Sequence, residues 1–287
     1  MQKLLSKWWF RIIVILIPIV LMYLFNSLFP FGFLVSTIFF CLLLTIISLL
    51  IQSSRAGSNF NFFGLQFDRF TIPDIIKGLL LVLLTNISFI IIGLIFGYSY
   101  NFHDNFYNYD YSTLAFYTLF IFVMAFNEEI VFRGVLFQSL RERFGDVFSI
   151  IVMSIFFSVV HLNNPNISTL AAVNIVLAGV FLSILYITTE SLWLPISFHF
   201  FWNLNQQVIL GSKISGLKFD IEILHLTAID NDLNWFFGGN FGTEEGLLTT
   251  IVITFLIFLS FKLNKRNPFI MATKFKVNYE ESKLLES

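Results

Sequence analysis

The chain has 287 residues, of which 57% are hydrophobic and 12% charged, and its mean hydropathy is +0.82. Soluble domains carry about 25% charged residues, so this composition excludes a soluble globular protein and indicates a membrane protein. The formal net charge of -1 provides no field that would attract nucleic acid. A single cysteine, Cys41, excludes an intrachain disulfide and a cysteine-based metal site.

Hydropathy predicts about eight membrane spans, because a helix needs about 20 apolar residues to cross the hydrocarbon. The spans are expected near residues 9–29, 32–51, 74–97, 112–136, 147–163, 168–187, 192–210 and 246–262. With the N-terminus inside, every Lys and Arg except Lys213 and Lys218 falls in an inner segment. We therefore predict an all-α fold, a polytopic transmembrane helical bundle with both termini cytoplasmic.

Three charged residues, Glu128, Glu129 and Arg133, lie within the apolar fourth span. Each charge costs at least about 2.5 kcal/mol in hydrocarbon, so a functional role is the first hypothesis. Glu129 and Arg133 have the i,i+4 spacing of an ion pair, and Glu128 projects about 100° away. We expect Glu129 to support the fold by facing Arg133, away from the cavity that receives Glu128. The alternative is a purely structural cluster of three.

Two further spans carry polar residues at helical spacing. His161 ends the fifth span one turn after Phe157, and it lies about as far beyond the turn at Gly145 as Glu128 lies before it. In an antiparallel hairpin the two residues share a level. His199 and Asn203 share one face of the seventh span. A boundary histidine and a structural hydrogen-bonding pair are the alternatives.

Together, Glu128, His161, His199 and Asn203 can hydrolyse a peptide bond if they converge on one cavity. Glu128 would take a proton from water and return it to the leaving amine, and His161 would position that water. His199 and Asn203 would donate hydrogen bonds to the oxyanion. No serine or cysteine lies beside these groups in the sequence, so water is the expected nucleophile.

Zinc is an open alternative for the same residues. Glu128, His161 and His199 are the metal ligands if the reaction is metal-dependent, since a catalytic zinc needs three protein ligands and water. The chain has no HExxH motif. The sequence therefore predicts no particular cofactor, and a divalent metal such as zinc remains an alternative.

The polar residues form three motifs in order: EExxxR at residues 128–133, FxxxH at 157–161 and HxxxN at 199–203. Ser191-Leu-Trp-Leu-Pro195 precedes the third. This set resembles the CPBP family of intramembrane endopeptidases, which includes CAAX prenyl proteases and bacteriocin-processing and immunity proteins. The resemblance covers about residues 125–205.

The resemblance implies an eight-helix fold with Glu128 and His161 catalytic, His199 and Asn203 contacting the oxyanion, and Glu129 with Arg133 as structural support. It implies a CAAX-type protease embedded in membrane lipid, in the cell membrane if bacterial. Its substrate would be a peptide or lipidated protein, with peptide or bacteriocin processing or immunity as the role in bacteria. The main alternative is a non-enzymatic scaffold or immunity protein of the same fold. A solute transporter is a weaker alternative.

The chain is expected to form one integral membrane domain in three parts. These are the N-terminal transmembrane helices (1–110), the catalytic helical core (111–210), and an extended loop, last transmembrane helix and cytoplasmic tail (211–287). His199 lies only about 11 Å from the inner end of its span, whereas Glu128 lies about 25 Å from the turn at Gly145. We therefore expect the fourth and fifth helices to extend below the bilayer.

Overall fold

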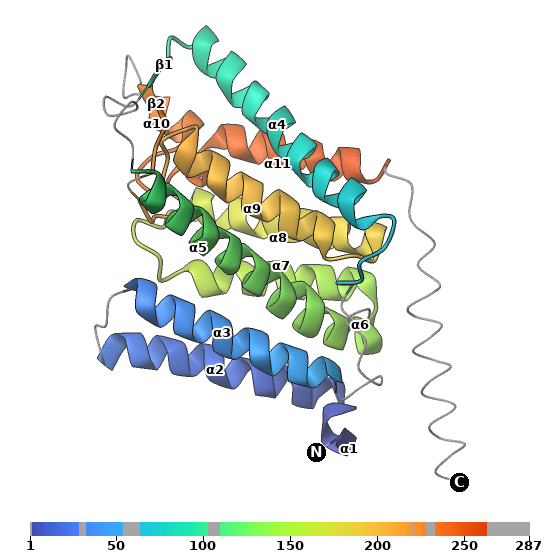
Figure 1. The fold of residues 1–287 in the computed structure, drawn as a ribbon. Helices are drawn as coiled ribbons and strands as arrows, with labels where there is room; N and C mark the ends of the chain where they lie inside the picture. Colours follow the sequence, from blue (N-terminus) through green and yellow to red (C-terminus); the bar gives the residue numbers. More distant parts are fainter. Residues whose placement is uncertain are drawn as a thin grey trace.

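The computed structural model describes residues 2–28, 33–53, 64–102, 110–219, 221–227 and 233–262, and it confirms the helical bundle (Figure 1). A helix occupies the position of each expected span. These helices are α2 (Trp8–Leu28), α3 (Phe33–Ser53), α4 (Thr71–Ile95), the continuous rod of α5 (Tyr111–Glu129), η3 (Ile130–Phe137) and α6 (Gln138–Phe144), α7 (Asp146–His161), α8 (Thr169–Thr189), α9 (Trp193–Val208) and α11 (Leu247–Ser260). Shorter helices are α1 (Gln2–Leu5), α10 (Asn234–Phe237) and the 3-10 turn η5 (Thr243–Glu245).

Within the described ranges, five helices are long and apolar enough to cross a membrane: α2, α3, α4, the α5–η3–α6 rod and α8. Helices α7 and α11 are apolar but shorter. Helix α9 has 16 residues and carries the polar HxxxN motif. The chain is thus a multi-pass membrane protein, while the number of complete crossings and the side of the termini stay predictions.

The rod from Tyr111 to Phe144 has 34 residues, or about 50 Å at helical rise. A hydrocarbon core is about 30 Å thick, so the rod is long enough to leave the bilayer, whereas the fifth helix, α7, has only 16 residues. The extension of both helices below the bilayer stays a prediction. Its end near Gly145 carries charges. Arg141 pairs with Glu190 at 2.8 Å, and Glu142 pairs with the buried Arg11 of α2 at 2.5 Å. These pairs connect the end of the rod to α2 and to the end of α8.

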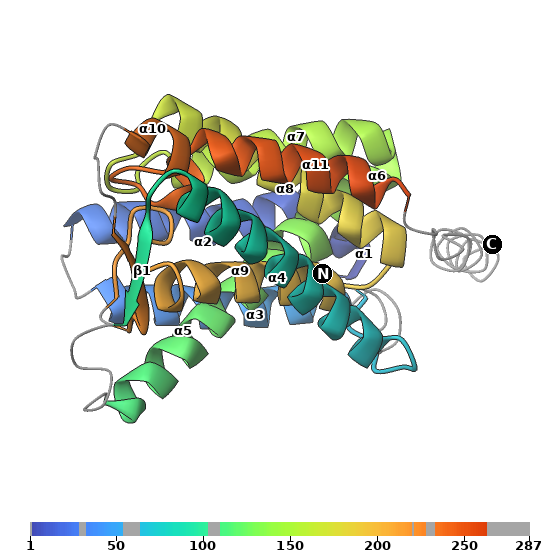
Figure 2. The same ribbon diagram turned by 90° about the horizontal axis from the view of Figure 1, so that it is seen from above.

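A two-stranded antiparallel sheet is the addition to the expected all-helical fold. Strand β1 (Ser99–Phe102) follows α4, and strand β2 (Leu224–Thr227) lies in the long connection between α9 and α11. Ser99 is paired with Thr227, and Phe102 with Leu224. The sheet thus joins the segment that follows α4 to the segment between α9 and α11, at one end of the bundle (Figure 2).

Close helix packing places the helices that carry the site. Helix α4 packs on α9, α7 on α8, and α8 on α11. A Cβ added at Gly179 of α8 would lie 2.8 Å from the Cα atom of Ser154 in α7, so only glycine fits this crossing. At Gly78 of α4 a Cβ would lie 2.5 Å from the hydroxyl of Ser197 in α9. Small residues at such crossings are typical of membrane helices, which gain stability mainly from close contact.

Candidate active site

The buried carboxylate of Glu129 joins Arg133 to His199. Its Oε1 atom accepts hydrogen bonds from Arg133 Nη1 at 2.9 Å and from His199 Nδ1 at 2.8 Å. Glu129 is 0% and Arg133 2% exposed, so the contacts are shielded from solvent. The predicted Glu129–Arg133 pair is present. The contact between this carboxylate and His199 was not predicted from the sequence.

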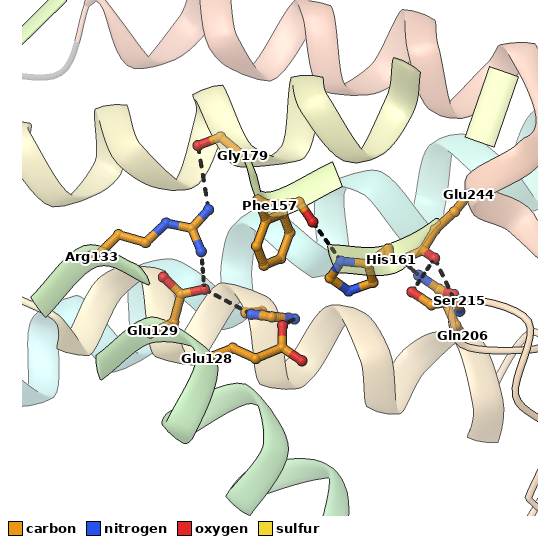
Figure 3. A network of polar contacts seen from close by, with 10 residues as sticks. Glu128, Glu129, Arg133, Phe157, His161, Gly179, Gln206, Ser215 and Glu244 are labelled. Carbon is orange, nitrogen blue, oxygen red and sulfur yellow. Dashed lines mark hydrogen bonds and ion pairs between the residues drawn. The ribbon is translucent and has the colours of Figure 1, made fainter. Parts of the chain in front are cut away.

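Arg133 has two further contacts that fix its guanidinium. Nη2 donates to the backbone carbonyl of Gly179 at 3.4 Å, and the guanidinium carbon lies 4.6 Å from the centre of the Phe157 ring (Figure 3). Gly179 and Phe157 belong to α8 and α7. The charge in the fourth span is therefore held by three helices, which limits where Glu129 can lie.

A π-helix begins directly after the two glutamates. It covers Ile130–Phe137, and all of its residues are buried. Such helices are rare and often occur at functional sites, because their i→i+5 hydrogen bonds change which side chains share a face. Nothing in the apolar pattern of the span indicated this departure from α-helical geometry.

Glu128 is the more accessible member of the glutamate pair, with 25% of its side chain exposed. Its Oε2 atom lies 3.8 Å from His199 Nε2 and has no hydrogen-bond partner. Because His199 uses Nδ1 to contact Glu129, its other ring nitrogen is the one that faces Glu128. The Oε2 atom is buried, and at 3.8 Å it lies close to Nε2 without a hydrogen bond between them.

His161 is oriented by its own helix. Its Nδ1 atom lies 2.6 Å from the backbone carbonyl of Phe157. A carbonyl only accepts, so Nδ1 carries a hydrogen and the neutral ring keeps Nε2 as an acceptor. The Phe157 ring lies 4.8 Å from the His161 ring and 6.2 Å from the His199 ring. Phe157 thus packs against both imidazoles.

One cavity brings His161, His199 and Asn203 together, as expected from their spacing. Glu128 is not part of its wall but lies beside it, through the 3.8 Å approach to His199. Four polar residues in the wall were missed from the sequence: Asn174, Ser215, Glu244 and Thr249. The remaining wall is mainly apolar, with Phe157, Ile175, Ala178, Phe181, Leu182, Phe198, Trp202, Ile253 and Leu256.

The side chains do not fit a zinc site. Among the described residues, no group of three or more His, Cys, Asp or Glu side chains is arranged to hold a metal ion. We derive no catalytic step through a metal.

The geometry defines a class: a membrane-embedded helical bundle with two imidazoles and an amide around one cavity and a carboxylate beside it. Residues 110–205, about a third of the chain, match the protein family described as type II CAAX prenyl endopeptidase Rce1-like. This match confirms the resemblance to CPBP intramembrane proteases that the three motifs carry. No curated protein and no solved structure matches the chain.

Proposed function

We propose that the protein is an intramembrane endopeptidase that hydrolyses a peptide bond with water activated by Glu128. The supporting observation is the approach of Glu128 Oε2 to His199 Nε2 at 3.8 Å, with Glu129 holding the opposite ring nitrogen. A free carboxylate oxygen beside a fixed imidazole is the geometry that general-base catalysis requires.

The histidines have different tasks in this proposal. His161 offers Nε2 as an acceptor for one hydrogen of the attacking water, because its Nδ1 atom is bound to Phe157. His199 lies between two carboxylates, so we assign it both ring protons. It then donates Nδ1–H to Glu129 and presents Nε2–H toward the reacting carbonyl.

Hydrolysis proceeds in two proton transfers. Glu128 takes a proton from water as the water oxygen bonds to the carbonyl carbon of the substrate. The negative charge that forms on the carbonyl oxygen accepts hydrogen bonds from His199 Nε2–H and the Asn203 amide. Glu128 then gives its proton to the leaving nitrogen as the carbon–nitrogen bond breaks, which restores the carboxylate.

The substrate in this proposal is a peptide or a lipidated protein that reaches the cavity from the membrane. The Rce1-like family supports a CAAX-protease-like endopeptidase at the level of the family. A role in peptide or bacteriocin processing, or in immunity, is the corresponding proposal if the chain is bacterial.

The test is mass spectrometry of peptides incubated with the purified full-length protein in detergent. We expect defined cleavage products from the wild type and none from Glu128→Gln, which keeps the shape of the side chain but removes the base. Glu245→Gln, a change at a carboxylate outside the cavity wall, is the matched control and should cleave normally. Equal cleavage by Glu128→Gln would overturn the mechanism. Absence of cleavage by every form would favour the non-enzymatic scaffold.

A further inference from the structure

The cavity extends beyond the proposed catalytic residues to a second carboxylate, that of Glu244. Glu244 lies in the η5 turn immediately before α11 and lines the same cavity as His161, His199 and Asn203. Figure 3 shows Glu244 on the far side of His161 from Arg133 and Glu129. Neither the proposed water activation nor the oxyanion contacts use this carboxylate.

Uncharged donors hold the Glu244 side chain in place. Its Oε2 atom accepts hydrogen bonds from the backbone N–H of Ser215 at 3.0 Å and from the Ser215 hydroxyl at 2.7 Å. Its Oε1 atom accepts a longer bond from Gln206 Nε2 at 3.3 Å. Ser215 has a left-handed backbone with φ of 47°, a conformation that costs about 1–3 kcal/mol for a residue other than glycine. The loop is therefore bent so that both Ser215 donors reach one oxygen.

No positive charge balances Glu244 within the part of the chain that the structure describes. None of the ion pairs among the described residues includes the Glu244 carboxylate. The nearby Lys213 donates instead to the backbone carbonyl of Asn240. Beside it, Gln206 is 0% exposed and its Oε1 atom has no hydrogen-bond partner. This end of the cavity thus has more acceptors than donors, which favours a ligand that brings donors and positive charge.

Apolar side chains form the cavity wall between the catalytic residues and Glu244. They come from α8, α9 and α11 and include Leu182, Trp202 and Ile253. Such a wall accommodates a hydrocarbon stem, and the carboxylate at its end accommodates a cationic head. Lysine and arginine side chains combine these two parts, with an apolar stem that packs and a charged tip that finds a polar partner.

We propose that Glu244 is a specificity-determining residue that binds a lysine or arginine side chain of the peptide near the scissile bond. This inference rests on the proposed function, because it assumes that the cavity receives a peptide. The Ser215 and Gln206 contacts keep the carboxylate fixed, so the substrate side chain meets a preformed partner. An acidic side chain at the same substrate position would be rejected by like charge.

Peptide retention by an inactive enzyme tests the assignment without requiring turnover. Full-length Glu128→Gln protein is immobilised in detergent and incubated with equimolar decapeptides that differ at one position, which carries lysine, acetyl-lysine or glutamate. The variable residue is moved through every position, and retained peptides are quantified by mass spectrometry. We expect lysine peptides to exceed acetyl-lysine peptides about tenfold at one position at least, as for a hydrogen bond to a charged group.

Two further variants assign the preference to this carboxylate. Adding Glu244→Gln should remove the lysine preference, whereas adding Glu245→Gln should preserve it, because Glu245 is bound to the backbone N–H of Phe241 and lies outside the cavity wall. Glu244→Asp keeps the charge, and it replaces Glu244→Gln in the retention assay if the Gln variant does not stay monodisperse. Its preference for lysine should keep the same sign.

Equal retention of lysine and acetyl-lysine peptides at every position would overturn the inference, and so would a preference that survives Glu244→Gln. The lysine and acetyl-lysine peptides are compared on protein that retains Glu244. A Glu244 variant that folds poorly therefore does not prevent the test of the inference. Lysine preference together with no cleavage by the wild type would overturn the proposed function and leave the binding site standing.

Discussion

Glu129 and His199 are 70 positions apart in the chain, yet the Glu129 carboxylate lies 2.8 Å from the imidazole Nδ1 atom. The same carboxylate oxygen is 2.9 Å from Arg133 Nη1. Glu129 therefore has two roles that mutations can separate: it neutralises a buried guanidinium, and it orients a proposed catalytic histidine. A carboxylate that accepts from one ring nitrogen fixes which nitrogen faces the substrate.

The double variant Glu129→Gln/Arg133→Met should separate these two roles. Glu129→Gln alone leaves a buried guanidinium without its counter-charge, which we expect to cost about 3–5 kcal/mol of stability. Removing both charges should recover most of the thermal stability in detergent. Turnover should remain lower by at least about 10²-fold, because without the negative charge of Glu129 the imidazole is no longer held with both ring protons and can adopt the wrong tautomer. Recovery of turnover along with stability would show that Glu129 is only structural.

Asn203→Ala should lower kcat by about 10²–10³-fold with a much smaller change in KM, the effect of removing one oxyanion donor. No hydrogen bond within the described residues depends on this side chain, so thermal stability should change little. Initial rates against peptide concentration provide both constants. A rise in KM at unchanged kcat would mean that Asn203 binds the substrate rather than the transition state.

The beginning of α5 should become less stable in acid. Hydrogen bonds from the side chains of Ser112 and Thr113 lower the pKa of Asp110, the N-cap of α5, to about 2. Because the folded pKa lies below the ordinary value, the stabilisation is present above about pH 4 and is lost as the pH falls toward 2. Hydrogen exchange at the first turn of α5 should follow this change. Asp110→Asn keeps an N-cap acceptor but does not titrate, so the protection of these amides, relative to the intrinsic exchange rate at each pH, should not vary in this range.

Chelation should leave hydrolysis intact, since the described His, Asp and Glu residues form no ligand group for a metal. The measurement is peptide cleavage before and after dialysis against a strong chelator, with metal content determined in the same sample. A loss of activity that returns on adding zinc would contradict this expectation and would require the site to rearrange.

The two sides of the membrane can be assigned by labelling cysteines in a Cys41→Ser background. With both termini cytoplasmic, Arg143→Cys should react only when an impermeant reagent reaches the inner side. Lys213→Cys should react from the outer side, since Lys213 is one of the two lysines that the charge asymmetry places there. The reverse pattern would invert the orientation of the whole bundle.

Hydropathy located every long helix, because a span must be apolar over most of its length whatever it packs against. Local spacing also identified the Glu129–Arg133 pair, since both residues lie on one helix. Hydropathy and local spacing do not predict contacts between segments that are distant in the chain. Glu244 is an example: it reaches the cavity only because the connection after α9 folds back so that Ser215 can bind it. An acidic residue next to an apolar span was the available signal, but it does not specify a partner.

The contact of Glu129 with His199 was missed for a related reason. Regular α-helical geometry places adjacent side chains about 100° apart, which suggested that the two glutamates face different parts of the bundle. Both approach the same imidazole, Glu129 at Nδ1 and Glu128 toward Nε2. An imidazole offers two nitrogens on opposite sides of its ring, and one residue can therefore serve two neighbours that diverge.

The π-helix after Glu129 has a consequence for how this segment can change during evolution. A π-turn contains one residue more than the α-turn it replaces, and each residue added or removed rotates the following helix by about 100°. Deleting Val131 would shorten the Glu129–Arg133 spacing and turn the guanidinium away from its partner. The segment Ile130–Phe137 should therefore tolerate exchange of one apolar residue for another far better than it tolerates a change in length.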